Sequence, residues 1–469
     1  MKTNQHGLQK LALTVALSLS AATGNLVADT WIGNGTQEDA NWSTGANWYS
    51  GTAPLPGSVI GLDTTANLNV GGTVTSYNDL ANISISGIKF RGNTALHLTG
   101  NALYFSGYQW LLENVSQPIT YVLDNDITFA QGIQLQLNQG GSNIGISPGI
   151  SFSGKFINGA ANGGGLSPGS WDANKTRYTI DIKNLYLSSA NATGAFNYTI
   201  QGNSADVTID RIYNQTEDSA RTDNYGLNLS GDSTLTVRIT GSADYRGNTS
   251  VRGGSTLIVG GTADITSSNL VQVWENASLF YNSNVTLEKF SWNNNGKLGG
   301  TGKILGSSAN FRDAGQNYTL RPGDLDATGT LHFVGNDAAG SGNVTWSNGA
   351  STLTYEWQFD GTSYDSVDID GTLTLGATNT YILNIGYLGD TDSAALAEFM
   401  AAAGGSLEVL KAAALTLNDA TWSLTGAGSE LLDLQITDSG LSLALIPEPS
   451  AWLLFAGGAA LLVCLRRRR

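Results

Sequence analysis

The sequence predicts an all-β protein, and the architecture it favours is a right-handed parallel β-helix with a short helical segment near its C-terminal end. Short strand cores recur with spacings of 22, 22, 19 and 22 residues, centred on Leu235, Leu257, Leu279, Leu298 and Leu320. A second series, with spacings of 22 and 20 residues, is centred on Leu331, Leu353 and Leu373. Gly, Asn and Asp corners separate the cores. A period near 20 residues built from alternating strands is typical of a solenoid, in which stacked units share one core.

The composition supports a β-fold and argues against nucleic-acid binding, disulfides and thiolate metal sites. Glycine accounts for 59 of 469 residues, and charged residues make up 13%, about half of the usual share of roughly 25%. The net charge is −15, which makes nucleic acid an improbable partner because such proteins carry a basic surface. The single cysteine, Cys464, lies near the C-terminus. The remaining chain therefore has neither disulfides nor thiolate metal sites.

The repeats are clearest over residues 233–385, whereas residues 140–225 are less periodic, and the glycine-rich stretch 159–169 within them is expected to be a loop. The competing architecture is an antiparallel sandwich or several small β domains. Residues 392–414 interrupt the β pattern: residues 393–403 predict a helix with Asp392 or Ser393 as its N-cap. Residues 407–414 could add further helical turns. We expect the helix to cover the last coil, and residues 422–445 to return to strands.

Both ends of the chain resemble targeting segments. Residues 1–28 combine Lys2 and Lys10 with an apolar stretch and small residues, which predicts a secretory signal peptide cut after Ala28. Residues 447–469 begin with an extended, acidic tripeptide that contains two prolines. An apolar run follows, within a predicted transmembrane segment at 450–465. The segment ends in a block of arginines, which we expect to stay on the cytoplasmic side. The tripeptide is Pro447, Glu448 and Pro449, and the arginines are Arg466, Arg467, Arg468 and Arg469. A domain of residues 29–446 lies between the two segments.

The C-terminal segment resembles the PEP-CTERM sorting signal, the substrate tag of exosortases in Gram-negative bacteria that make exopolysaccharide. The resemblance implies an exosortase as partner and transient anchoring in the inner membrane through the C-terminal helix. It also implies that the tripeptide is the sorting and processing motif. The alternative is a plain C-terminal membrane anchor. The predicted span is short for a permanent transmembrane helix of roughly 20 residues, which favours an anchor that is later cut.

Residues 245–261, which read YRGNTSVRGGSTLIVGG, look like the autotransporter-associated β-strand repeat. The blocks that usually follow this repeat resemble LGGTGKI at 298–304, LRPGD at 320–324, GTLHF at 329–333 and YDSVDIDGTLTL at 364–375. The opening residues 30–60, with Trp31, Trp42 and Trp48, also fit the start of such a passenger domain. The resemblance implies a β-helix with a structural or adhesive role. In contrast to autotransporters, the sorting segment stands where they carry a membrane barrel.

Catalytic chemistry is weakly indicated. Glycoside hydrolysis needs two carboxylates held several ångströms apart, and the candidate pairs are Asp324 with Asp326 and Asp368 with Asp370. We expect these aspartates to occupy coil corners. His97 and His332 each lie between apolar residues, so alternation is expected to turn them outward. The chain is therefore expected not to be an enzyme.

A calcium site of the EF-hand type is excluded around Asp368 and Asp370, because the position of the bidentate glutamate holds Ala377. A looser calcium site among corner aspartates stays an open alternative, and no other metal or cofactor is expected.

Two aromatic groups could contact carbohydrate. The first contains Trp31, Trp42, Trp48 and Tyr49, and the second contains Tyr104, Tyr108 and Trp110. The favoured interpretation of the first group is a cap that plugs the first coil.

Together these features predict an exported, non-enzymatic β-helix of the cell surface or extracellular matrix, associated with exopolysaccharide or biofilm. The alternative is a β-helix that binds or degrades polysaccharide as an enzyme.

Overall fold

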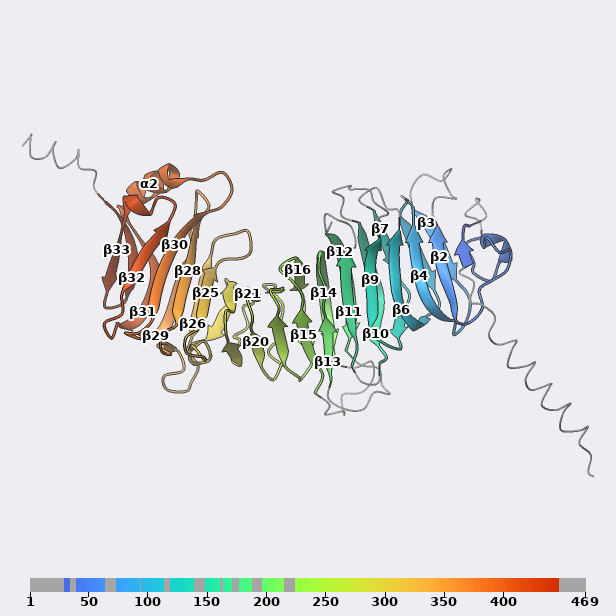
Figure 1. The fold of residues 1–469 in the computed structure, drawn as a ribbon, viewed down its shortest axis with the longest axis horizontal. Coiled ribbons are helices and arrows are strands. Elements are labelled where there is room, and N and C mark those ends of the chain that lie inside the picture. The colour runs from blue at the N-terminus through green and yellow to red at the C-terminus, as the bar shows by residue number, and fades with distance from the viewer. Residues whose placement is uncertain are drawn as a thin grey trace, which may run out of the picture.

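The computed structural model describes residues 29–33, 39–63, 73–92, 94–113, 119–138, 148–160, 163–170, 177–187, 196–214 and 224–446. These residues form an elongated molecule made mostly of β-strands, with one α-helix among them, α2 (Ser393–Ala402). The strands lie side by side along the long axis (Figure 1). Nearly all pair in parallel, so the antiparallel sandwich is wrong and the long parallel sheets agree with the predicted solenoid.

The parallel strands form three ladders, which the chain visits in the same order in each coil. Ladder I runs without a break from β3 to β32. Its members are β3 (Val74–Asn78), β5 (Leu96–Gly100), β7 (Thr120–Leu123), the first parts of β10 (Gly149–Asn158), β12 (Tyr178–Tyr186) and β14 (Ala205–Tyr213), β16 (Leu235–Ile239), β19 (Thr256–Val259), β21 (Ser278–Tyr281), β23 (Lys297–Gly300), β25 (Asn317–Pro322), β28 (Thr352–Phe359), β30 (Thr380–Tyr387) and β32 (Trp422–Gly426).

Ladder II follows ladder I in each coil. It contains the first parts of β4 (Ser84–Arg91) and β6 (Leu103–Glu113), then β8 (Ile127–Phe129), the last parts of β10, β12 and β14, β17 (Ala243–Asp244), β24 (Lys303–Leu305), β26 (Thr330–Val334) and the first parts of β29 (Ser366–Leu375) and β31 (Ser406–Thr416). Between β17 and β24 this ladder is reduced to isolated bridges.

Ladder III completes the coil. It contains β1 (Asp29–Trp31), β2 (Ser58–Asp63), the last parts of β4 and β6, β9 (Ile133–Asn138), β11 (Gly165–Ser170), β13 (Asn197–Ile200), β15 (Gly226–Ser230), β18 (Thr249–Arg252), β20 (Val271–Val273), β22 (Phe290–Trp292), β27 (Val344–Trp346) and the last parts of β29 and β31.

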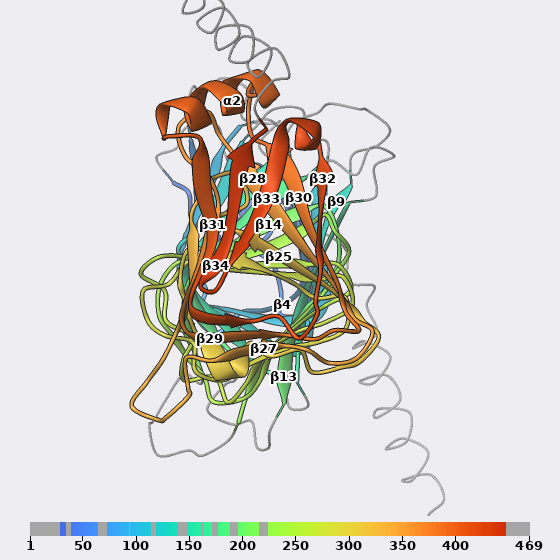
Figure 2. The ribbon, with the colours of Figure 1, turned by 90° about the vertical axis from the view of Figure 1, so that its left-hand side faces the viewer.

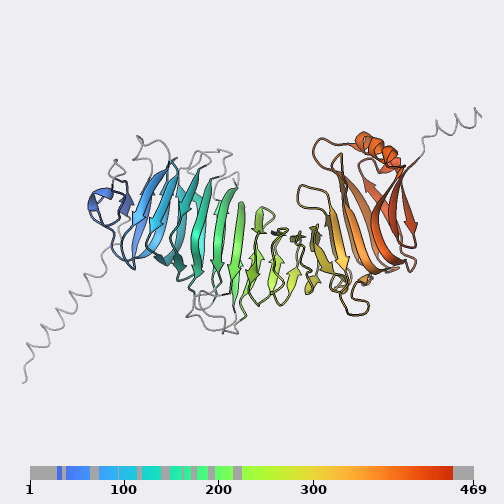
Figure 3. The ribbon, with the colours of Figure 1, turned by 180° about the vertical axis from the view of Figure 1, so that it is seen from behind.

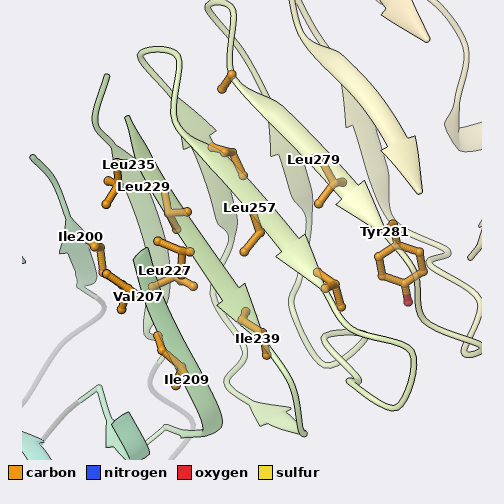
Figure 4. Packing of buried hydrophobic residues seen from close by; sticks show 14 of the residues in the cluster. Ile200, Val207, Ile209, Leu227, Leu229, Leu235, Ile239, Leu257, Leu279 and Tyr281 are labelled. Atoms are coloured by element: carbon orange, nitrogen blue, oxygen red, sulfur yellow. The ribbon is translucent and has the colours of Figure 1, made fainter. Parts of the chain in front are cut away.

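One continuous apolar core fills the space between the ladders. Alternation along each short strand turns every second side chain inward, where it stacks on its equivalents in the neighbouring coils (Figure 4). On ladder I, Val237, Leu257 and Leu279 occupy equivalent positions and are fully buried. This is the shared core that stacked repeats need.

The register confirms most of the first predicted repeat series and corrects the rest. Leu257, Leu279, Leu298 and Leu320 are neighbours on ladder I. Leu235 is not in register with them, because Val237 pairs with Leu257. The second series is wrong as a register: Leu331 lies on ladder II, Leu353 on ladder I and Leu373 on ladder III.

Two predictions of local structure are also wrong. Residues 407–414 are not helical but belong to β31, whose inward residues Leu407, Val409 and Leu410 are buried. The glycine-rich stretch 159–169 is not simply a loop, because residues from Gly165 onward form β11 and pair with β9 and β13. Parallel pairing on both sides outweighs the low strand propensity of glycine there.

The molecule narrows in its middle and is wider toward both ends (Figure 3). Strand length follows this shape: β14 has 9 residues, whereas β16 has 5 and β19 has 4. We call this narrow region, with β16, β19, β21 and β23 on ladder I, the waist. The stretch at 245–261 that resembles the autotransporter repeat lies in it.

The last coil is covered as the sequence predicted. Helix α2 lies across one edge of the C-terminal end, with β33 (Leu432–Thr437) and β34 (Gly440–Leu445) beside it (Figure 2). Asp392 is the N-cap and accepts a hydrogen bond from the backbone N–H of Ala395. β34 pairs antiparallel with β31 and with β33, so residues 422–445 return to strands as expected.

Candidate functional site

The targeting residues lie outside the part of the chain that the structure describes. This applies to the signal peptide with Ala28, the tripeptide Pro447–Glu448–Pro449, the segment 450–465 and the arginines 466–469. Among the helices that are described, none is long and apolar enough to cross a membrane. The sorting segment therefore stays a prediction.

The first candidate carboxylate pair lies in a segment that folds back over the waist. Residues 323–328, which we call the strap, connect β25 to β26. Asp324 lies 4.0 Å from the guanidinium of Arg238, which belongs to a coil several strands earlier on ladder I. Asp326 is exposed. The Asp324 carboxylate therefore has a cationic partner on the waist.

Ladder I has an unusual feature at the waist. Ile258 and Phe280 occupy the outward positions between Arg238 and Gly299, yet both are buried, with 0% and 4% exposure. The guanidinium carbon of Arg321 lies 5.6 Å from the centre of the Phe280 ring, a cation–π contact. At least one of these apolar outward residues is thus covered by a long side chain of a later strand, β25.

Two aspartates that the sequence analysis did not single out hold the base of the strap. Asp365 accepts a hydrogen bond from the backbone N–H of Gly329 at 3.0 Å. Asp360 accepts from the Thr328 hydroxyl at 2.8 Å and from the backbone and hydroxyl of Ser363. The middle of the strap is fixed by Arg321, which donates to the carbonyl of Leu325 at 2.6 Å.

The environments of these two aspartates move their pKa values in opposite directions. Burial raises the pKa of Asp365 to about 8, although the Gly329 N–H and the charge of Arg321 act against it. Partial burial would raise the pKa of Asp360, but hydrogen bonds from Ser363, Thr362 and Thr328 outweigh it and lower that pKa. A split pair of carboxyl groups is a feature of acid–base sites. Here, however, Asp365 is fully buried and Asp360 is saturated by turn hydrogen bonds, so the pair is placed for holding the strap.

Asp365 could have been found from the sequence. It stands two residues before Val367 and four before Ile369, both of which are buried. Alternation therefore turns its carboxyl group inward.

The second candidate pair is also divided. Asp368 lies in an outward row of ladder II whose members are Lys303, His332, Asp368 and Lys411. Its carboxylate is 3.6 Å from Nδ1 of His332. Asp370 instead accepts a hydrogen bond from the backbone N–H of Gly335 at 3.0 Å. The two carboxylates thus have separate structural partners.

The histidines face outward, as alternation predicted. The side chain of His97 is 37% exposed and that of His332 is 38% exposed. His97 contacts the carboxylate of Asp124, which also accepts from the Ser153 hydroxyl. Burial would raise the pKa of Asp124, but the hydrogen bonds from Ser153 and His97 outweigh it and lower the pKa.

The first aromatic group is a cap, as the favoured interpretation predicted. Trp31, Trp42 and Trp48 are 1%, 0% and 2% exposed, and only Tyr49 faces solvent. Trp42 donates from Nε1 to the Ser76 hydroxyl at 2.8 Å, which ties the cap to β3. The second group is divided, since Trp110 is buried and Tyr104 is 45% exposed.

In the described residues, no group of three or more metal-ligating side chains is placed to hold a metal ion. The open alternative of a loose calcium site thus gains no candidate ligand set there.

Comparison with known proteins adds no identity: no family model and no curated protein matches this chain. Both family resemblances therefore rest on the motifs quoted above.

Proposed function

We propose that this chain is an exported, right-handed parallel β-helix that acts as a structural or adhesive rod on the cell surface or in the extracellular matrix. Its C-terminal segment would be read by an exosortase at Glu448 and its flanking prolines, after transient anchoring in the inner membrane. The mature rod would then associate with exopolysaccharide or biofilm.

The observation that carries this proposal is an unbroken rod with both ends covered. Ladder I continues from β3 to β32, which corresponds to a length of about 60 Å at roughly 4.8 Å per strand. The tryptophan group covers one end, while α2 and the hairpin of β33 and β34 cover the other. Covered ends oppose edge-to-edge growth. Such a rod suits a protein that projects from a surface or spans a matrix.

The sorting step is tested by the substitution Glu448→Ala, with Glu398→Ala on the exposed face of α2 as the matched control. If an exosortase reads the tripeptide, Glu448→Ala should leave the chain membrane-held and unprocessed, while Glu398→Ala should be processed like the parent. Cell fractionation and mass spectrometry of the mature C-terminus measure both results. Equal processing of the parent and Glu448→Ala would contradict the proposal.

A further inference from the structure

A polar groove crosses the outward face of ladder III in the N-terminal half of the rod. Its volume is about 470 Å³. It is lined by residues of β9, β11 and β15 and of the corner after β13: Gln134, Gln136, Ser167, Pro168, Gly169, Gln201, Gly202, Asn203, Ser230, Gly231 and Asp232. The groove therefore runs across successive coils, along the axis of the rod.

The floor of the groove is held in place from inside the core. The hydroxyl of the fully buried Tyr178 donates to the carbonyl of Leu135 at 2.6 Å. The same hydroxyl accepts from the backbone N–H of Gly169 at 2.7 Å, so one core residue fixes both β9 and β11. Close packing continues at Gly202, where a Cβ atom would lie 1.7 Å from the carbonyl oxygen of Pro168.

Gly169 keeps the groove open. A Cβ atom at this position would have no heavy atom within 4 Å, so the missing side chain leaves space above the strand. Ser167 and Gly169 point outward while Leu166 is buried beneath them. The groove thus exists because small residues of β11 stand between the longer side chains of β9 and the corner after β13.

The groove presents amides and hydroxyls. Its side chains include the amides of Gln134, Gln136, Gln201 and Asn203 and the hydroxyls of Ser167 and Ser230. The side-chain amides of Gln134 and Gln201 make no hydrogen bond within the described chain. Each amide offers both donors and an acceptor, which complements a hydroxyl group that donates and accepts. Asp232 is the only charged residue in this lining, so an anionic ligand would be disfavoured.

We propose that this groove binds a segment of neutral polysaccharide that lies along the rod axis. This inference rests on the proposed function and names the ligand class and the site. The lining contains no aromatic side chain on which a sugar ring could stack, so each contact is weak. A polymer that engages many rods at once would still be held firmly, because linked weak sites gain avidity.

The test is a groove-filling variant with a matched control. Gly169→Leu places a side chain in the groove, whereas Gly349→Leu makes the same change at another glycine with open space around its Cβ position. The probes are the neutral polysaccharides dextran and laminarin and the anionic polysaccharide alginate. Affinity electrophoresis of the full chain measures binding, and circular dichroism checks that each variant is folded.

We expect retardation by at least one neutral polysaccharide but not by alginate, with Gly169→Leu at least tenfold weaker and Gly349→Leu unchanged. The double variant Gln134→Ala with Gln201→Ala, which removes amides without filling the groove, should also bind more weakly. Retardation by none of the probes, or equal retardation of the parent and Gly169→Leu, would overturn the inference. So would a parent that sediments as a dimer and becomes a monomer in Gly169→Leu, because a second copy would then occupy the groove.

Delivery to the surface and binding in the groove can be measured separately. Gly169→Leu should still be exported and processed in cells, since the groove is far from the sorting segment in the sequence. A parent chain that never reaches the surface or matrix would refute the proposed function, while groove binding could still be measured in solution. A parent chain that is delivered normally but binds no polysaccharide in the groove would refute the groove site alone.

Discussion

At the scale of single residues, the most informative side chain is Asp365. Its carboxyl group is fully buried, and its Oδ1 accepts a hydrogen bond from Gly329 while Oδ2 has no partner in the described chain. A buried carboxylate is costly in free energy, so burial raises the pKa of Asp365 to about 8 and the group is neutral at lower pH. The base of the strap is therefore stable with a proton on Asp365.

This raised pKa predicts a loss of stability as the pH rises from about 4 to about 8. The unfolded chain releases the Asp365 proton near pH 4, whereas the folded chain keeps it to about pH 8. The free energy of unfolding should therefore fall as the pH rises from 4 to 8, by about 1.4 kcal/mol per unit of pKa difference. Asp365→Asn removes this charge, so its melting temperature should fall less between pH 5 and pH 8.5. The exposed Asp337→Asn is the control, and identical pH profiles for parent and Asp365→Asn would contradict the prediction.

At the scale of elements, periodicity predicted the stacking of strands but not the length of each coil. The leucines from Leu257 to Leu320 are in register because the waist coils have nearly constant length. The coil before them is two residues shorter than the series assumed, so Val237 takes the place of Leu235. The groove could not be predicted, because Gly169 and Gln201 come together only through the register of β9, β11 and β13.

Helix propensity was a weaker guide than tertiary pairing. Alanine-rich residues continue past α2 into β31, for which the composition suggested further helical turns. They form a strand because β29 and β34 pair with both edges of β31. The helix boundary is instead set by Asp392 at its start and by Gly404 and Gly405, both with positive φ, after its end.

The cap of α2 gives a test at this scale. Asp392→Ala removes the hydrogen bond to the Ala395 N–H, which should cost about 1 kcal/mol of helix stability. Because repeat-like folds can open locally, the effect should be confined to α2 and the end of the rod. Hydrogen exchange of the α2 amides should therefore accelerate about fivefold. The exposed Asp390→Ala should have no such effect, and equal exchange in both variants would show that the cap is unimportant.

At the scale of the whole molecule, stability depends on what covers the two ends of the core. A stack of parallel strands has a free edge at each end, which can fray or pair with another molecule. At the N-terminal end the cover is the tryptophan group, in which Trp48 donates to the carbonyl of Trp42 at 2.8 Å. Trp31 forms a bridge to Trp48 and thereby joins ladder III to the same cap. The cap thus links two ladders of the first coils.

Trp42 is the centre of this cap and gives the strongest test of the capped rod. Its ring packs edge-on against Trp48 with centroids 5.5 Å apart, and its backbone N–H donates to the carbonyl of Tyr77 on β3. Trp42→Ala should cost about 3–5 kcal/mol locally, as for other buried aromatic residues. Hydrogen exchange should show lost protection in β3 and β5 but not in β28 and β30, and sedimentation should reveal association through the uncovered end. Tyr49→Ala, at a position 83% exposed, should leave both measurements unchanged. If Trp42→Ala also leaves β3 and β5 protected and the rod monomeric, the first coils must be stable without the cap.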